Sequence, residues 1–314
     1  MKRRKIVVGA VAIIIGLPVV LALITWVSFY ALVSSFAPNR TNGTIVSSGE
    51  KREYLLYVPR SYDRAKPTPL VISVHAAMNW PAFQMKLSQW NKVADENGFI
   101  VVYPAGTGTG FKTWYMEGSR TPSRMPDVRF VSELIDTLEA TYNIDPTRIY
   151  ANGMSNGGGM AFALSCTLSH RIAAIGAVSA AQSLPFSWCA DSTPVPMIEF
   201  HGTGDPLVPF KGAPAGWLNP KPFPNVATWV ANWARRNRCG PNPVDSAVTG
   251  DVTRREYTNC ADNAAVVLYV VKGGGHQWPG GKPMPEWMVG PMSRSIDATS
   301  RMWAFFREHP LPRK

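Results

Sequence analysis

The sequence predicts an α/β fold in which helices flank a mostly parallel central sheet, and two observations support this prediction. Strand-like runs alternate with helical patterns after residue 50, which is the alternation that a parallel sheet requires. The 314-residue sequence also shows no internal repeat, low-complexity tract or second domain. Residues 50–314 are therefore expected to form one folded domain, since undivided α/β folds commonly reach this length.

The N-terminus predicts a membrane anchor. A basic cluster at residues 1–5 precedes an apolar stretch, 6–33, that contains no charged residue. About 20 apolar residues span a bilayer, whereas a cleaved signal peptide has a shorter apolar core and a clear cleavage site. Pro38 follows the best cleavage candidate, where it is unfavourable. We therefore expect residues 1–37 to be a transmembrane signal-anchor with a cytoplasmic basic tip, or else a signal peptide whose removal releases a secreted domain.

The remaining elements follow from local patterns. Residues 38–49 are polar and are expected to form a short tether before a first strand pair around 54–58. Runs rich in β-branched residues predict further strands, and apolar spacing of about 3.6 residues predicts helices. We expect strands at 70–75, 148–152, 196–201 and 265–271, and helices at 83–97, 128–142, 157–166 and 296–306.

The segment Gly153-Met154-Ser155-Asn156-Gly157 lies between the strand expected at 148–152 and the helix expected at 157–166. A G-x-S-x-G sequence at such a strand-to-helix turn is the place where serine hydrolases carry their nucleophile. The turn is sharp and strained, and glycines flank the serine because a Cβ there would strike a neighbouring element. The motif therefore predicts Ser155 as a nucleophile.

A histidine and an acid follow in the chain order Ser, Asp, His that is typical of an α/β-hydrolase. His276 comes after the strand expected at 265–271 and a run of three glycines, so it would lie at the carboxyl end of a core strand, where sheet enzymes gather their chemistry. His75 precedes the serine, and His309 lies just after the helix expected at 296–306. His276 is therefore the predicted general base.

Asp205 is the predicted acid because it follows the strand expected at 196–201 within a short loop. Its carboxylate would accept a hydrogen bond from the imidazole and stabilise the imidazolium that forms during acyl transfer. An Asx turn before Pro206 would explain the same residue without catalysis. Asp191 and Asp262 are weaker alternatives, since each lies beside a cysteine with no strand directly before it.

The oxyanion hole is expected to use backbone N–H groups. One comes from Asn156, directly after the nucleophile, and the other from Ala76 or Ala77 in the loop after the strand expected at 70–75.

Five sequence blocks carry a further signal: VISVH at 71–75, YNIDPxRIY at 142–150, GMSNGG at 153–158, HGTxD at 201–205 and GGGHxWPG at 273–280. Together they resemble the polyhydroxybutyrate depolymerase-like esterases, a family related to feruloyl and acetylxylan esterases. The resemblance covers about residues 50–282 and implies an α/β-hydrolase fold with Ser155, Asp205 and His276 as its triad. Ala76 departs from the family, which usually has glycine at this position, so a required positive φ would strain the loop.

The four cysteines form an even set in a domain that we expect to face an oxidising compartment, so disulfides are favoured over metal ligands. No C-x-x-C spacing indicates a zinc site, and no cofactor is implied. We predict the pairs Cys239–Cys260 and Cys166–Cys189, while the sequence leaves the other two connectivities open.

The net charge and two tryptophans give further expectations about binding partners. The net charge of +11 fits proximity to an anionic surface, and no nucleic-acid-reading motif accompanies it, so no nucleic-acid partner is expected. Trp114 and Trp278 lie near the expected site loops and are candidates for lining a substrate pocket. Large aromatic side chains also simply pack domain interiors, which remains the alternative for both.

Together these features predict a membrane-anchored, extracytoplasmic serine esterase that works through an acyl-enzyme. The resemblance implies a small aromatic or hydroxyalkanoate ester, or an acylated polysaccharide, as substrate. Two alternatives remain. An acyltransferase would use the same three residues and pass the acyl group to another alcohol, and a catalytically silent hydrolase fold would serve as a surface binding protein.

Overall fold

The computed structural model describes residues 20, 24–115, 125–182, 185–189, 192–215 and 222–312. The chain divides into two compact units, Met1–Asn39 and Arg40–Lys314. In the first unit a helix covers 24–36. No helix within the described residues is long and apolar enough to cross a bilayer. Most of the expected anchor, residues 1–19 and 21–23, lies outside the described residues, and so does the alternative acid Asp191.

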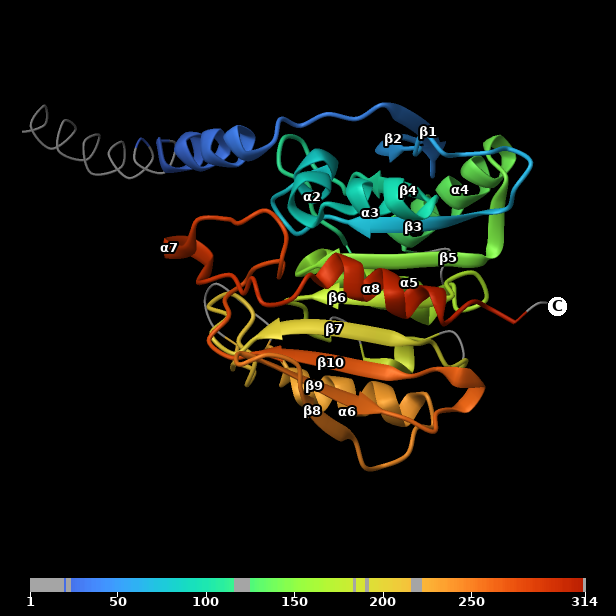
Figure 1. The fold of residues 1–314 in the computed structure, drawn as a ribbon. Helices are drawn as coiled ribbons and strands as arrows, with labels where there is room; N and C mark the ends of the chain where they lie inside the picture. The colour runs from blue at the N-terminus through green and yellow to red at the C-terminus, as the bar shows by residue number, and fades with distance from the viewer. Residues whose placement is uncertain are drawn as a thin grey trace, which may run out of the picture. The chain divides into compact units, whose positions relative to one another are not determined.

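The second unit contains a ten-stranded sheet in the order β1-β2-β4-β3-β5-β6-β7-β10-β9-β8 (Figure 1). The six central strands from β4 to β10 in this order are parallel, and antiparallel strands complete both edges. This arrangement confirms the predicted mostly parallel sheet. The strands are β1 Gly43–Ser47, β2 Glu50–Tyr57, β3 Thr68–Val74, β4 Ile100–Pro104, β5 Ile144–Met154, β6 Ala174–Val178, β7 Met197–Gly202, β8 Val244–Ala247, β9 Val252–Tyr257 and β10 Val266–Val271.

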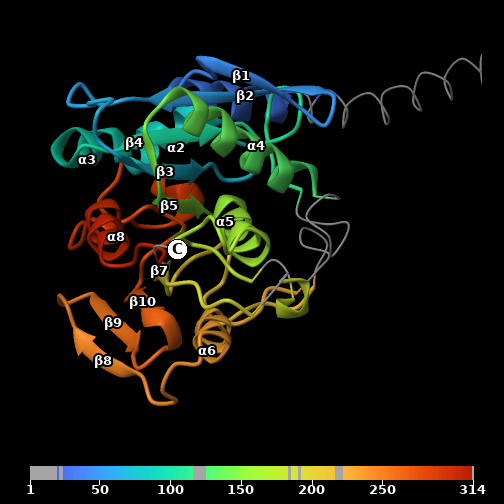
Figure 2. The same ribbon diagram turned by 90° about the vertical axis from the view of Figure 1, so that its right-hand side faces the viewer.

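Helices cover both faces of the sheet (Figure 2). α3 and α8 lie on one face, and α4, α5 and α6 lie on the other. This is the layered architecture expected for strands that are buried on both sides. The helices are α2 Pro81–Ser88, α3 Trp90–Asn97, α4 Pro126–Thr141, α5 Asn156–Thr167, α6 Val226–Arg236, α7 Glu286–Val289 and α8 Ala298–Arg307.

Two expected segments differ in the structure. The single helix expected at 83–97 is divided into α2 and α3 by Gln89, which has a φ of 59°. The last carbonyls of α2 bind elsewhere: Leu87 accepts a hydrogen bond from the N–H of Lys282, and Ser88 accepts one from the Thr299 hydroxyl. The expected tether, 38–49, is also shorter than predicted, because its residues 43–47 form β1 and pair with β2.

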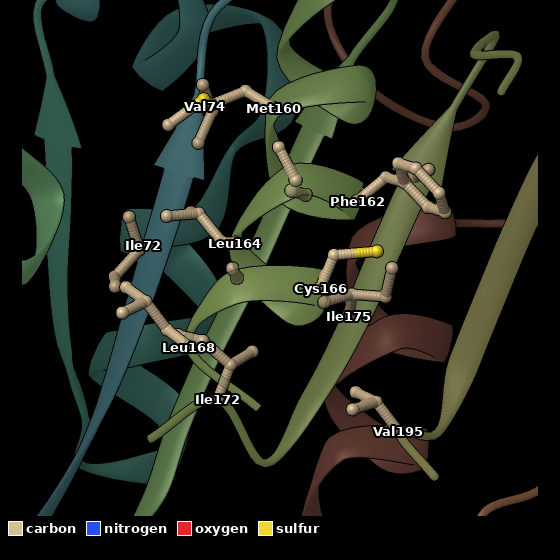
Figure 3. Packing of buried hydrophobic residues seen from close by; sticks show 14 of the residues in the cluster. Ile72, Val74, Met160, Phe162, Leu164, Cys166, Leu168, Ile172, Ile175 and Val195 are labelled. Carbon is tan, nitrogen blue, oxygen red and sulfur yellow. The ribbon is translucent and has the colours of Figure 1, made fainter. Parts of the chain in front are cut away.

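The core around α5 fixes the element that follows the serine motif. Every residue of α5 after Asn156 is buried. Figure 3 shows Phe162 and Leu164 of α5 packed beside Ile72 of β3 and Ile175 of β6. A helix buried on all sides cannot shift without opening cavities, so the turn at its N-terminus is held rigidly.

Both predicted disulfides are confirmed. Cys166, in the last turn of α5, is bonded to Cys189, and Cys239, shortly after α6, is bonded to Cys260. Each bond joins cysteines about twenty residues apart, with separations of 23 and 21. Closing such loops reduces the freedom of the unfolded chain, which stabilises the domain.

Candidate active site

Ser155 occupies the sharp turn between β5 and α5. Its φ of 53° and ψ of −121° fall outside the regions that non-glycine residues normally adopt. Its N–H donates to the carbonyl of Val178 on the neighbouring β6, and its carbonyl accepts from the N–H of Gly159 in α5. These backbone bonds, from a strand and from a helix, hold the serine in this strained conformation.

The two glycines of the motif are required by close packing, as predicted. A Cβ on Gly157 would lie 2.3 Å from the carbonyl oxygen of Val74, and a Cβ on Gly153 would lie 2.4 Å from the backbone of Gly157. Both distances are far below a normal contact between atoms. β3 can therefore approach the start of α5 only because these side chains are absent.

His276 and Asp205 are brought together. Nδ1 of His276 lies 2.8 Å from Oδ2 of Asp205, and the two residues are 4% and 5% exposed. The other carboxylate oxygen accepts hydrogen bonds from the N–H groups of Leu207 and Val208, each at 2.8 Å. Burial would raise the pKa of Asp205, but the hydrogen bond and charge of His276, with the N–H of Val208, lower it overall. The carboxylate is thus held ionised against the imidazole.

The sheet explains this meeting. β7 and β10 are parallel neighbours, so the loops that follow them leave the same edge of the sheet side by side. The His276 loop is fastened further by backbone bonds from Gly275 to Pro291 at 2.7 Å and from His276 to Val289 at 2.6 Å. Ser155 follows β5 at the same carboxyl edge. Among the described residues, no hydrogen bond joins its hydroxyl to His276.

The expected oxyanion loop is held by His75, which is fully buried. Its Nδ1–H donates to the carbonyl of Ala76 at 2.7 Å, and its Nε2 accepts from the N–H of Gly106 at 3.0 Å. Burial lowers the pKa of His75 to about 4, so the ring is neutral. Positive φ in this loop occurs at Met78 and not at Ala76, so alanine causes no strain of the kind anticipated at that position.

The N–H groups expected to form the oxyanion hole have no competing partner. Within the described residues, those of Ala76, Ala77 and Asn156 donate to no protein acceptor. The side chain of Asn156 instead accepts a hydrogen bond from the N–H of Trp114 at 2.9 Å, which ties the nucleophile turn to the loop after β4. The backbone donors are thus available, and the loops that carry them are connected.

Trp114 and Trp278 pack inside the protein, which differs from the pocket position expected for them. They are 3% and 0% exposed. The indole N–H of Trp114 donates to the carbonyl of His75, and that of Trp278 donates to the hydroxyl of Thr299. Large rings with an internal partner for the N–H fill the core instead of facing substrate. The packing alternative therefore describes both residues.

Sequence reasoning missed two buried ionisable residues beside Asp205. Glu199 and His201 lie on β7, and Nδ1 of His201 is 3.0 Å from Oε1 of Glu199. Their spacing of two residues puts both side chains on one face of the strand, and two polar residues in such a buried strand were the available signal. In the described part of the chain, no group of acidic, histidine or cysteine side chains is arranged to hold a metal.

Comparisons with known proteins agree with this architecture. The family described as esterase PHB depolymerase matches residues 52–186. The chain is 33% identical over 163 residues to a bifunctional acetylxylan esterase/xylanase from Neocallimastix patriciarum, a match that covers 52% of this chain and 23% of that protein. It is 27% identical over 281 residues to feruloyl esterase C from Emericella nidulans, covering 86% of this chain and 88% of that protein.

A solved structure adds evidence on the fold alone. The acetyl xylan esterase from Aspergillus awamori superimposes with a TM-score of 0.57 at 16% sequence identity, over 77% of this chain and 92% of that one. The family match over residues 52–186 and these relatives show that the chain is similar to the polyhydroxybutyrate depolymerase-like esterases, and that it is an enzyme of the carboxylic ester hydrolase class.

Proposed function

We propose that the chain is an extracytoplasmic serine esterase whose triad is Ser155, His276 and Asp205. One observation supports this above all: the strained serine stands at the same sheet edge as a buried histidine–carboxylate pair with a separation of 2.8 Å. Strained backbone at a serine and a histidine oriented by an acid are the two features that an activated nucleophile needs. Neither feature is required for packing an α/β domain.

In this mechanism Oγ of Ser155 attacks the ester carbonyl while Nε2 of His276 takes the hydroxyl proton. Asp205 accepts the Nδ1–H and stabilises the imidazolium. The negative oxygen of the tetrahedral intermediate is bound by the N–H of Asn156 and by one from Ala76 or Ala77. His276 then returns its proton to the leaving alcohol. Water, deprotonated by the same histidine, attacks the acyl-enzyme and releases the acid.

The substrate that we propose is a small aromatic or hydroxyalkanoate ester, or an acylated polysaccharide. Relatives named as feruloyl and acetylxylan esterases support this range. Exposed apolar side chains also support it: Met78, on the loop after β3, is 46% exposed, Leu207, on the loop after β7, is 50% exposed, and Trp287, in α7, is 80% exposed. Exposed apolar side chains of this kind can contact an acyl or sugar group.

The extracytoplasmic location is supported by the two disulfides, since such bonds persist in oxidising compartments. We also propose that residues 1–37 anchor the catalytic domain, residues 50–314, to the membrane or direct its export. This part is tested by the size and fractionation of the protein in its own cells. Release from membranes by alkaline carbonate would contradict an uncleaved anchor.

The catalytic proposal is tested by labelling the protein with a fluorophosphonate and measuring its intact mass. We expect one adduct on the native protein and none on Ser155→Ala, with loss of hydrolysis of p-nitrophenyl acetate in that variant. Ser300→Ala, which changes an exposed serine of α8, serves as the matched control and should label normally. Equal labelling of Ser155→Ala would refute the assignment of the nucleophile.

A further inference from the structure

His201 lies directly behind the proposed acid, and its ring nitrogens face oxygen atoms on both sides. The residue is 1% exposed. Nδ1 lies 3.0 Å from Oε1 of Glu199. Nε2 lies 2.9 Å from the carbonyl oxygen of Val208 and 3.6 Å from Oδ2 of Asp205. All three neighbours are hydrogen-bond acceptors when the two carboxyl groups are ionised.

Acceptors at both nitrogens favour a proton on both, which is the imidazolium form of histidine. Glu199 is also fully buried, and burial raises its pKa, against the hydrogen bond and charge of His201 and the N–H of Ala180 at 3.2 Å, which lower it. An ionised Glu199 would supply the balancing negative charge. Buried charges persist where they are paired and hydrogen-bonded. Burial by itself would lower the pKa of His201, but the contacts with Glu199, Val208 and Asp205 raise it.

We propose that Glu199 holds His201 as a buried imidazolium and that this cation is a positioning residue for Asp205 and His276. The inference rests on the proposed function, because it assigns a role within the same triad. Among the described residues, the titratable groups that face His201 are Glu199 on its own strand, Asp205 on the following loop and, beyond Asp205, His276. The ring of Phe210 also packs against it, with the ring centroids 5.8 Å apart.

The first role of the cation is geometric. Its Nε2–H binds the carbonyl of Val208, while the N–H of Val208 donates to Asp205 at 2.8 Å. The turn from Asp205 to Val208 is therefore held both by the carboxylate and by the strand before it. On the other side, Oε1 of Glu199 accepts a hydrogen bond from the N–H of Ala180. The side chain of Ala180 packs so closely against Gly158 of α5 that a Cβ on Gly158 would clash with it. The pair thus connects both halves of the site.

The second role is electrostatic. A positive charge 3.6 Å from Oδ2 of Asp205 offsets part of the negative charge that attracts a proton to His276. The carboxylate that binds Nδ1 of His276 thus presents less net negative charge to that ring. Without the cation, the full negative charge of Asp205 would face His276.

Nuclear magnetic resonance of ¹⁵N-histidine-labelled full-length protein tests the charge directly. We expect His201 to show two protonated ring nitrogens at about pH 8, well above the usual histidine range. Its signals are identified by their loss in His201→Gln. In Glu199→Gln, which keeps the shape but cannot be an anion, His201 should become neutral. A neutral His201 in the native protein at pH 7 overturns the proposal.

The pH profile of kcat/KM for p-nitrophenyl acetate tests the role. In Glu199→Gln we expect the acid limb to move up by roughly half a pH unit or more. Activity should fall most in mild acid and recover within about twofold above pH 8. The control is Glu139→Gln, which removes the negative charge of an α4 carboxylate that binds Arg171. This variant should leave the pH profile of kcat/KM unchanged.

A purely structural role gives a different result, namely an equal loss of activity at every pH. That outcome, or a profile that superimposes on the native one, overturns the proposal. If Glu199→Gln does not fold, the resonance experiment on the native protein decides alone. If the native protein hydrolyses no ester, the proposed function fails, and the charge of His201 is still measured independently.

Discussion

Two buried histidines beside the site, His75 and His201, differ in their neighbours and therefore in their charge. His75 has one acceptor, the carbonyl of Ala76, and one donor, the N–H of Gly106, and burial lowers its pKa to about 4. His201 faces acceptors only, and its pKa is raised. Both are fully buried. The comparison teaches that the partners of a buried histidine, and not burial alone, set its protonation.

The largest effect should come from Asp205, the carboxylate shared by His201 and His276. We expect Asp205→Asn to lower kcat by about 10³-fold or more, because the amide no longer selects the tautomer of His276 or stabilises its cation. The measurement is kcat on a p-nitrophenyl ester at neutral pH, with Asp245→Asn at an exposed ion pair as control. A loss below about tenfold would show that Asp205 is not the triad acid.

The second effect concerns His75 and appears as stability. Its pKa is about 4 in the folded protein and near 6.5 when unfolded. Between these values the unfolded state binds more protons, so stability falls as pH decreases from 6.5 to 4, by up to about 3 kcal/mol. Urea unfolding across this range should show a flatter pH dependence in His75→Gln. Parallel curves for the two proteins would contradict the neutral buried ring.

A smaller effect is expected for Trp114, whose indole N–H binds the carbonyl of His75. Trp114→Phe leaves this buried carbonyl without its donor and removes part of a large ring, which should destabilise the domain by about 2 kcal/mol. It should also lower kcat several-fold by loosening the loop that carries Ala76. Chemical unfolding and kinetics measure the two effects, and unchanged values of both would remove Trp114 from the support of that loop.

The smallest effect is expected for Ala76→Gly, which restores the residue usual in the family. Because Ala76 does not have positive φ, glycine relieves no strain and only adds freedom to the unfolded chain. Stability should fall by about 0.5–1 kcal/mol, and kcat should change less than about twofold. A clear gain in kcat would indicate that alanine does distort the oxyanion loop.

Much of the fold follows from local patterns in the sequence. The strands around 148–152 and 265–271 and the helix after Ser155 were predictable because buried parallel strands and packed helices leave continuous apolar runs. The contact between Asp205 and His276 was predictable from their positions after strands that leave one sheet edge. Family resemblance strengthened these assignments but was not needed for that contact.

Other features depend on distant partners and left no local signal. The break at Gln89 depends on the segment near Lys282 and Thr299, which binds the last carbonyls of α2. The burial of Trp278 depends on the same Thr299. The charge of His201 depends on the carbonyl of Val208 and the Asp205 carboxylate, whose positions only the folded loop defines. Propensity and periodicity cannot report such contacts.

The hydrogen bond from Thr299 to Ser88 joins positions 211 residues apart. Contacts between such distant positions form late and slow the search for the native topology. The segment 276–299, which carries the proposed base, is fastened to α2 through this bond and through Lys282. A chain emerging from the ribosome would therefore lack this attachment of the proposed base to α2 until α8 has been synthesised.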